Sequence, residues 1–154
     1  MKSLLLLTAA MALGTTSAHA GDKTDVEVNT KDKYEAGPSE YFTGDVTVGS
    51  FFESGENDYK GAVVNFKKGA RTNWHTHPRG QTLVVTAGEG RVQAEGKAVQ
   101  VIRPGDTVWI PAGVRHWHGA APHSTMTHIA IQTANAEGKV VDWQDAVTDK
   151  QYKD

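Results

Sequence analysis

The sequence contains no cysteine among its 154 residues. Disulfide bonds, which often stabilise small exported domains, are therefore excluded. The fold must instead depend on its hydrophobic core, on a partner subunit or on a bound metal. The chain also lacks a basic surplus, since 16 Lys and Arg residues are balanced by 18 Asp and Glu residues. This balance leaves no basic stripe for nucleic acid, so we expect no nucleic-acid partner.

A long hydrophobic segment is missing as well. The apolar stretch from Leu4 to Leu13 is about half of the roughly 20 residues that span a bilayer. It follows Lys2 and precedes small residues that end in Ala-His-Ala at residues 18–20, which is the pattern of a cleaved secretory signal. We therefore predict a signal peptide over residues 1–20, no membrane association after its removal, and a periplasmic location in a Gram-negative bacterium.

The rest of the chain divides into a leader and one domain. Residues 21–39 are polar and charged, which is typical of a flexible leader. From residue 40 onward, short β-type runs alternate with turn residues and no helical periodicity extends across them. Residues 40–154 are therefore predicted to form one all-β sandwich or barrel. Near the end, Thr148 and Gln151 form a capping-box pattern, which predicts a short C-terminal helix.

Histidines gather in the predicted strands. Residues two apart on a strand share a face, so His75 and His77 project together. Gln81 begins the run after a Pro-Arg-Gly turn, and a hairpin there would bring it back toward this pair. His116 and His118 repeat the two-residue spacing later in the chain. The spacings of the histidines in the β-type runs allow them to converge on one interior.

A fifth strand histidine, His128, alternates with apolar Ile129 and Ile131. A single histidine in a strand is more often a hydrogen-bonded core or surface residue than a ligand. The two His-x-His pairs favour another interpretation. Several imidazoles that face one interior are costly to bury without partners, and a divalent metal supplies the partner.

The spacing around these residues resembles the two sequence motifs of the cupin superfamily. The matching positions are Gly69, His75, His77, Gln81 and Gly88 in the first motif, and Gly105, Pro111, Gly113 and His116 in the second. Gln81 stands where the family usually has glutamate, and Ala120 stands where asparagine is common. The resemblance implies a single-domain cupin, a conical antiparallel β-barrel or jelly roll, which pairs as a homodimer.

By the same resemblance, the metal ligands are His75, His77, Gln81 and His116. Imidazole together with oxygen ligands fits Mn, Fe, Co, Ni or Zn. Because all four side chains are neutral, a divalent ion would keep its full charge and act as a stronger Lewis acid than beside a carboxylate.

Longer stretches of the sequence resemble one group within the superfamily. ARTNWHTHPRGQTLVVTAG, HWHGAAP and VDWQDAVTDKQY are similar to the manganese-dependent hydroxynitrile lyases among small bacterial cupins, and to the carboxymuconolactone-decarboxylase-associated cupins around them. This likeness implies manganese as the cofactor and a cyanohydrin as the small-molecule substrate. It also implies that His118 removes the hydroxyl proton while His128 stabilises or reprotonates the departing cyanide.

Two other functions fit the same ligand set. One is a dioxygenase-type cupin, in which redox-active Fe or Mn binds oxygen and the histidines orient an enol or aromatic substrate. The other is a non-catalytic periplasmic cupin that binds a metal or a small molecule. Metal-dependent turnover of mandelonitrile separates the lyase from both, and oxygen uptake separates the other two from each other.

Overall fold

The computed structural model describes residues 26, 28, 33–54 and 59–153. The predicted signal peptide and most of the predicted leader lie outside these residues, so both stay predictions. Within the described residues the protein is nearly all β, as its sequence predicts. The strands are β1 (Tyr34–Ala36), β2 (Phe42–Thr43), β3 (Val46–Ser54), β4 (Tyr59–Phe66), β5 (Arg71–Thr72), β6 (His75–Thr76), β7 (Gln81–Gly88), β8 (Gly90–Ala94), β9 (Gln100–Ile102), β10 (Thr107–Ile110), β11 (His116–Ala120), β12 (Met126–Thr133) and β13 (Asp142–Trp143), followed by the helix α1 (Asp149–Lys153).

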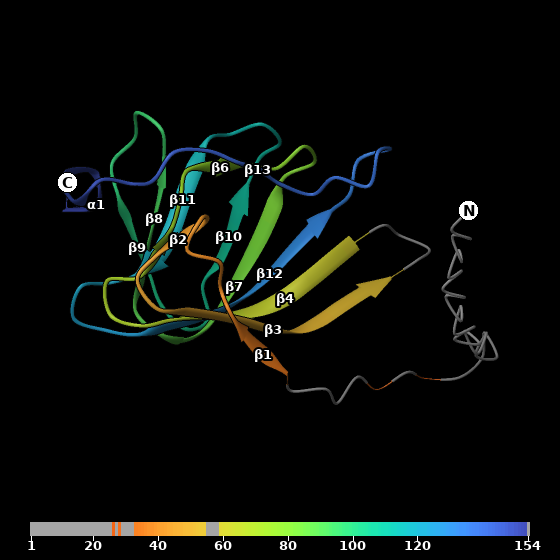
Figure 1. Cartoon of the computed structure of the whole chain (residues 1–154), viewed down its shortest axis with the longest axis horizontal. Coiled ribbons are helices and arrows are strands. Elements are labelled where there is room, and N and C mark those ends of the chain that lie inside the picture. The colour runs from red at the N-terminus through yellow and green to blue at the C-terminus, as the bar shows by residue number, and fades with distance from the viewer. Residues whose placement is uncertain (1–25, 27, 29–32, 55–58, 154) are drawn as a thin grey trace, which may run out of the picture.

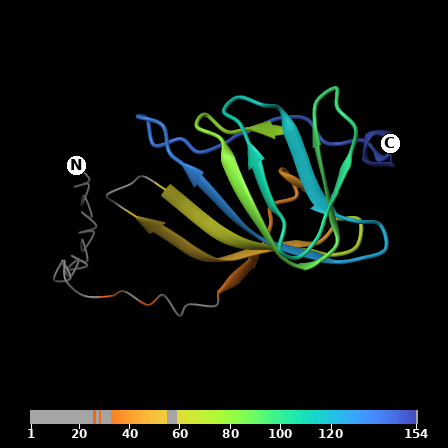
Figure 2. The same ribbon diagram turned by 180° about the vertical axis from the view of Figure 1, so that it is seen from behind.

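The strands form two antiparallel sheets. Sheet A has the order β1-β3-β4-β12-β7-β10. Sheet B has the order β13-β6-β11-β5-β2, and β8 pairs with β11 and then with β9. Figure 1 shows the two sheets curling toward each other as a half-barrel, and Figure 2 shows the same arrangement from behind. The predicted antiparallel barrel class with a short C-terminal helix is therefore confirmed.

Alternating side chains define the inner face of sheet A. Strand β4 buries Ala62, Val64 and Phe66, whereas Val63 and Asn65 between them are only half-buried. Strand β12 buries His128 and Ala130 with the same period of two. Branched and aromatic residues such as these fit a pleated surface with one buried face. The pattern places His128 on the interior of the barrel beside apolar neighbours.

An apolar core fills the space between the sheets. Its buried members are Val46, Val64, Phe66, Ala70, Val85, Val92, Ile102, Ala120 and Met126. Phe66 is 1 % exposed, and full burial of such a side chain contributes about 1.5–3 kcal/mol. Its ring centroid lies 6.1 Å from that of His118 and 5.4 Å from that of His128. The core therefore ends directly against the buried histidines.

A tight turn joins the histidine-bearing strand β6 to β7. Gly80 has a φ of 81°, a conformation that glycine adopts without steric cost. A Cβ added there would lie 2.6 Å from the ring of Trp109 and 2.7 Å from the carbonyl oxygen of Ile110. Both the backbone angle and the packing thus require glycine, and the turn delivers Gln81 to the start of β7.

The C-terminal helix begins with the predicted capping box. The backbone N–H of Gln151 donates to the hydroxyl of Thr148 at 3.2 Å, and the backbone N–H of Thr148 donates to the side-chain oxygen of Gln151 at 2.9 Å. The helix buries Tyr152 in a second apolar cluster with Trp74, Trp117 and Val147. In the described part of the chain, no helix has both the length and the apolar character that a membrane crossing requires.

Candidate metal and catalytic site

Strand pairing brings His75 and His116 together. These two residues are register partners between β6 and β11, so their side chains leave sheet B on the same face. Their ring centroids lie 4.2 Å apart, and His77 lies 5.1 Å from His75 and 5.6 Å from His116. All three side chains are buried. Two strands distant in sequence thereby gather three imidazoles at one point.

Backbone carbonyls hold each of these rings. The Nδ1 atoms of His75 and His116 lie 2.9 Å from the carbonyl oxygens of Asn73 and Val114, and Nδ1 of His77 lies 2.6 Å from that of Val140. A carbonyl oxygen only accepts, so each Nδ1 carries the proton. Each Nε2 then bears a lone pair, which is the form that binds a metal.

The Gln81 side chain supplies an oxygen to the same point. Its Nε2 donates to Oε1 of Gln132 at 3.2 Å, and its Oε1 lies 3.4 Å from Nε2 of His116. Neither of these last two atoms has a proton to donate, because the proton of His116 is on Nδ1. Nε2 of His77 is buried and has no hydrogen-bond partner in the described part of the chain. Oε1 of Gln81 and Nε2 of His116 thus turn lone pairs toward each other, and Nε2 of His77 offers a third. A cation would satisfy all three, so these residues suit a metal ion.

His118 extends this cluster. Among the described His, Asp and Glu residues, His75, His116 and His118 form the group whose ring nitrogens lie within 4.8 Å of one another. This group includes His118, which the sequence suggests as a base, and omits His77, which the sequence suggests as a ligand. The ligand set His75, His77, Gln81 and His116 therefore stays a prediction. What the structure provides is three buried histidines able to hold a metal.

His118 and His128 form a pair across the barrel. Nε2 of His128 lies 3.1 Å from Nδ1 of His118, and both side chains are buried. The backbone N–H of His118 donates to the hydroxyl of Thr72 at 3.2 Å. The register of β12 against β7 shifts between Thr127 and His128, and such a bulge re-aims the side chain that follows. Nε2 of His118 has no partner within the described residues.

Burial keeps the histidines neutral. Desolvation lowers the pKa of His116 and of His128 to about 4. The pKa values of His75 and His118 fall well below the ordinary value, first through desolvation and then through neighbouring histidines, and that of His77 is also lowered by desolvation. Near neutral pH these rings therefore offer lone pairs to a metal or to a substrate proton.

The histidines open into a mainly apolar cavity of about 160 Å³. Its walls include Phe42, Val48, Phe51, Ala62, Val64, Thr72, Ala130, Gln132, Val141 and Trp143, together with five of the six predicted site residues. The sixth, His116, lies behind them against His75 and Gln81. The structure thus brings all six predicted residues together beside space for a small apolar molecule.

Some contributors to the site were not predicted. The carbonyl groups of Asn73, Val114 and Val140 orient the ligands, and a backbone oxygen leaves no signature in residue type. Trp143 lies against His75, with 4.7 Å between ring centroids, and lines the cavity. Its only sequence signal is its place in the C-terminal stretch VDWQDAVTDKQY.

The antiparallel half-barrel and the histidines grouped inside it are typical of a cupin. The cupin domain model matches residues 62–131, a range that contains all six predicted site residues. The family is also shown by an (R)-mandelonitrile lyase from Granulicella tundricola. That enzyme is 54 % identical to this chain over 118 residues, which cover 76 % of this chain and 89 % of the enzyme. The chain therefore belongs to the cupin family.

Solved structures agree with this assignment. A cupin-like protein from Thermotoga maritima is 38 % identical, covers 82 % of this chain and 96 % of its own, and superposes with a TM-score of 0.73. A cupin-2 domain protein from Rhodospirillum rubrum is 18 % identical, with a TM-score of 0.58 over 79 % of this chain and 78 % of its own. The second likeness concerns the fold alone.

Proposed function

We propose that this cupin is a metal-dependent carbon–carbon lyase that cleaves or forms cyanohydrins, with manganese as the favoured ion. The observation that carries the proposal is the histidine arrangement. Three rings held by carbonyls lie with centroids 4.2 to 5.6 Å apart and keep their Nε2 atoms unprotonated, and His118, whose Nε2 has no partner among the described residues, lines the adjoining apolar cavity. The similarity to a (R)-mandelonitrile lyase supports the reaction type.

We assign metal binding to four side chains, those of His75, His77, Gln81 and His116. When bound, a divalent ion supplies Lewis acidity that lowers the pKa of an alcohol oxygen. The protein's contribution is to fix its ligands before binding, since every imidazole already has its Nδ1 proton engaged. Fixed outer contacts of this kind raise ligand basicity and set ring orientation.

His118 is assigned the role of general base. When its Nδ1–H donates to Nε2 of His128, its own Nε2 bears the lone pair that faces the cavity. His118 takes the hydroxyl proton of the cyanohydrin, the oxygen forms a carbonyl group, and the bond between the carbinol and nitrile carbons breaks. The electron pair of that bond leaves with cyanide, which receives a proton from the His118–His128 pair. The products are an aldehyde and hydrogen cyanide.

The apolar walls suit an aromatic substrate. Val48, Val64 and Trp143 border the same cavity as the histidines, and an apolar environment strengthens charge interactions at the reacting oxygen.

The proposal is tested by incubating the protein with mandelonitrile, with and without added manganese, and measuring benzaldehyde and cyanide. Release of both only with metal supports the lyase. Oxygen uptake with an enol or aromatic substrate, without mandelonitrile cleavage, would replace it by an oxygenase. Bound metal without either activity would leave a binding protein.

A further inference from the structure

The C-terminal segment reaches the site along the edge of sheet B. Residues 140–152, named here the C-terminal strap, include β13 and most of α1. Strand β13 pairs with β6 so that Trp143 is opposite His75. The carbonyl oxygen of Val140 accepts from Nδ1 of His77 at 2.6 Å. The strap therefore contacts both histidines of the first predicted motif.

The pairing next to the site is short. Strand β13 has two register pairs with β6. Beyond it, the N–H of Gln144 donates to the carbonyl oxygen of Trp74 at 2.9 Å, and the N–H of Trp74 donates to that of Asp145 at 3.0 Å. A ladder this brief is marginal by itself, since short isolated pairings have little stability in water. Its position must depend on what holds the rest of the strap.

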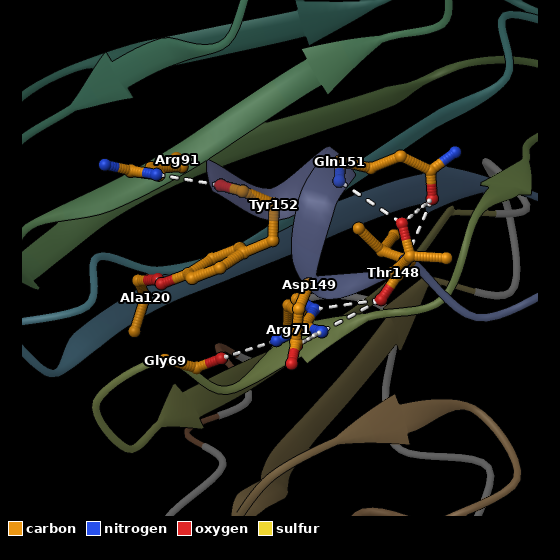
Figure 3. A network of polar contacts seen from close by, with 9 residues as sticks. Gly69, Arg71, Arg91, Ala120, Thr148, Asp149, Gln151 and Tyr152 are labelled. Carbon is orange, nitrogen blue, oxygen red and sulfur yellow. Dashed lines mark hydrogen bonds and ion pairs between the residues drawn. The ribbon is translucent and has the colours of Figure 1, made fainter. Parts of the chain in front are cut away.

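The end of the strap is anchored on the outer face of sheet B. Nε and Nη2 of Arg71 donate to the carbonyl oxygen of Val147 at 3.2 and 2.9 Å, and Nη2 also bonds Asp149 at 2.8 Å. Arg71 lies over the ring of Tyr152, 4.6 Å from its centroid. Figure 3 shows these side chains converging beneath the helix.

Tyr152 is fixed from two further directions. Its hydroxyl donates to the carbonyl oxygen of Ala120 at 2.6 Å, and Nη1 of Arg91 donates to its backbone carbonyl oxygen at 2.8 Å (Figure 3). The guanidinium of Arg91 also lies over the Tyr152 ring, 5.3 Å from its centroid. Tyr152 is 5 % exposed. Tyr152 is thus held by residues of three strands of sheet B, β5, β8 and β11.

Arg71 joins this anchor to the site through its own strand. The side chain of Arg71 is 7 % exposed, and a buried guanidinium is tolerated only when its donors are satisfied. The next residue, Thr72, lines the cavity and accepts from the N–H of His118. Asn73 follows and bonds His75 through its carbonyl oxygen and Gln144 through its side chain. Arg71 therefore faces the strap at the start of the segment that carries the ligands.

We propose that Arg71 and Tyr152 are positioning residues for the metal site: by anchoring the C-terminal strap they keep the Val140 carbonyl on His77 and β13 along β6. The benefit for metal affinity rests on the proposed function. The placement of His77 does not, because it depends on the bond of its Nδ1 to the carbonyl oxygen of Val140. Loss of the anchor should therefore loosen residues 72–77 while the barrel remains folded.

The test uses the full chain with Tyr152→Ala and Arg71→Lys, and Lys150→Ala as the control, because Lys150 is an exposed residue of the same helix. Hydrogen exchange of metal-free protein should become about tenfold faster in residues 72–77 and 140–146 of both variants. Nitrogen NMR of labelled histidine should show His77 losing its single Nδ1-protonated form. Lys150→Ala should match the parent in both measurements.

Manganese binding adds a readout for the linked claim. Affinity should fall about 10- to 100-fold in the two variants, the usual cost of losing an outer contact to a ligand. Parent-like exchange and an unchanged His77 tautomer in both variants would overturn the inference, whether or not metal binds. A parent protein that binds no metal would overturn the proposed function, and the exchange and tautomer results would still decide the positioning role. If Tyr152→Ala does not fold, Tyr152→Phe removes only the bond to Ala120 and should give a smaller effect in the same direction.

Discussion

The buried histidines form two neighbouring regions beside the cavity, and these regions hold their rings differently. His75, His77 and His116 each give a proton to a backbone carbonyl oxygen. His118 and His128 bond to each other. A carbonyl fixes one tautomer, whereas two imidazoles can exchange which ring donates. The first region therefore suits the proposed metal ligands, and the second suits the proposed proton transfer.

The largest effect should follow from damage to the first region. His77→Ala removes one Nε2 donor from a site in which the other donors cannot rearrange, so stoichiometric manganese should be lost. Elemental analysis after gel filtration measures it. His123→Ala is the control, since His123 is exposed and paired with Glu89. Metal bound by His77→Ala as tightly as by the parent would place the site elsewhere.

Damage to the second region should leave metal in place and remove turnover. A general base contributes about 100- to 10,000-fold in rate, so His118→Ala should cleave mandelonitrile slower by that factor. Manganese content and cleavage should be measured on the same preparation. Full activity would show that the base is another group. Loss of metal together with activity would move His118 into the ligand region, next to His75 and His116.

The pH dependence of the free energy of unfolding, measured on chelated protein, tests the second region through His128. Burial lowers the pKa of His128 to about 4 from an ordinary 6.5, so between these values the unfolded chain binds a proton that the folded protein excludes. The free energy of unfolding should fall as the pH drops from 6.5 to 4, by about 3 kcal/mol for this residue. Urea unfolding of chelated protein measures it. His128→Leu should lose less stability over this interval, and an unchanged pH slope would contradict the assignment.

The smallest effect is expected at the boundary of the two regions. Gln132→Leu removes the acceptor that orients the Gln81 amide, so Oε1 of Gln81 is no longer fixed toward His116. Manganese affinity should fall about tenfold, at the low end for an outer contact. Titration calorimetry measures it, with the exposed Gln100→Leu as a matched control. Equal affinities for Gln132→Leu and the parent would mean that Gln81 is held by other contacts.

Local pattern and the family resemblance together predicted the fold. Turn residues and short β-type runs predicted an all-β sandwich or barrel, and the resemblance to the cupin motifs implied an antiparallel barrel. Thr148 with Gln151 predicted the helix cap that the structure contains. The grouping of the six site residues also followed, because His75 and His116 lie on strands that pair in register. Their individual roles as ligand or base stay predictions.

Contacts between residues far apart in the chain could not be predicted from the sequence. The carbonyl oxygen of Val140 orients His77 across 63 residues, and any residue type can supply such an oxygen. The His118–His128 bond joins two sheets, and the register of β12 against β7 shifts directly before His128, which no residue pattern marks. No local sequence pattern marks the role of Arg71, because its partners Val147 and Tyr152 approach it only in the folded chain.

The central claim is that a metal held by the carbonyl-fixed histidines is required for cyanohydrin cleavage. Its most direct test is to strip the protein with a chelator, add back manganese in steps, and follow mandelonitrile cleavage together with bound metal. The account predicts no cleavage in the stripped protein and a linear rise that stops at about one ion per chain, the number expected for a single closed set of ligands. Cleavage that does not depend on manganese, or none at full loading, would contradict it.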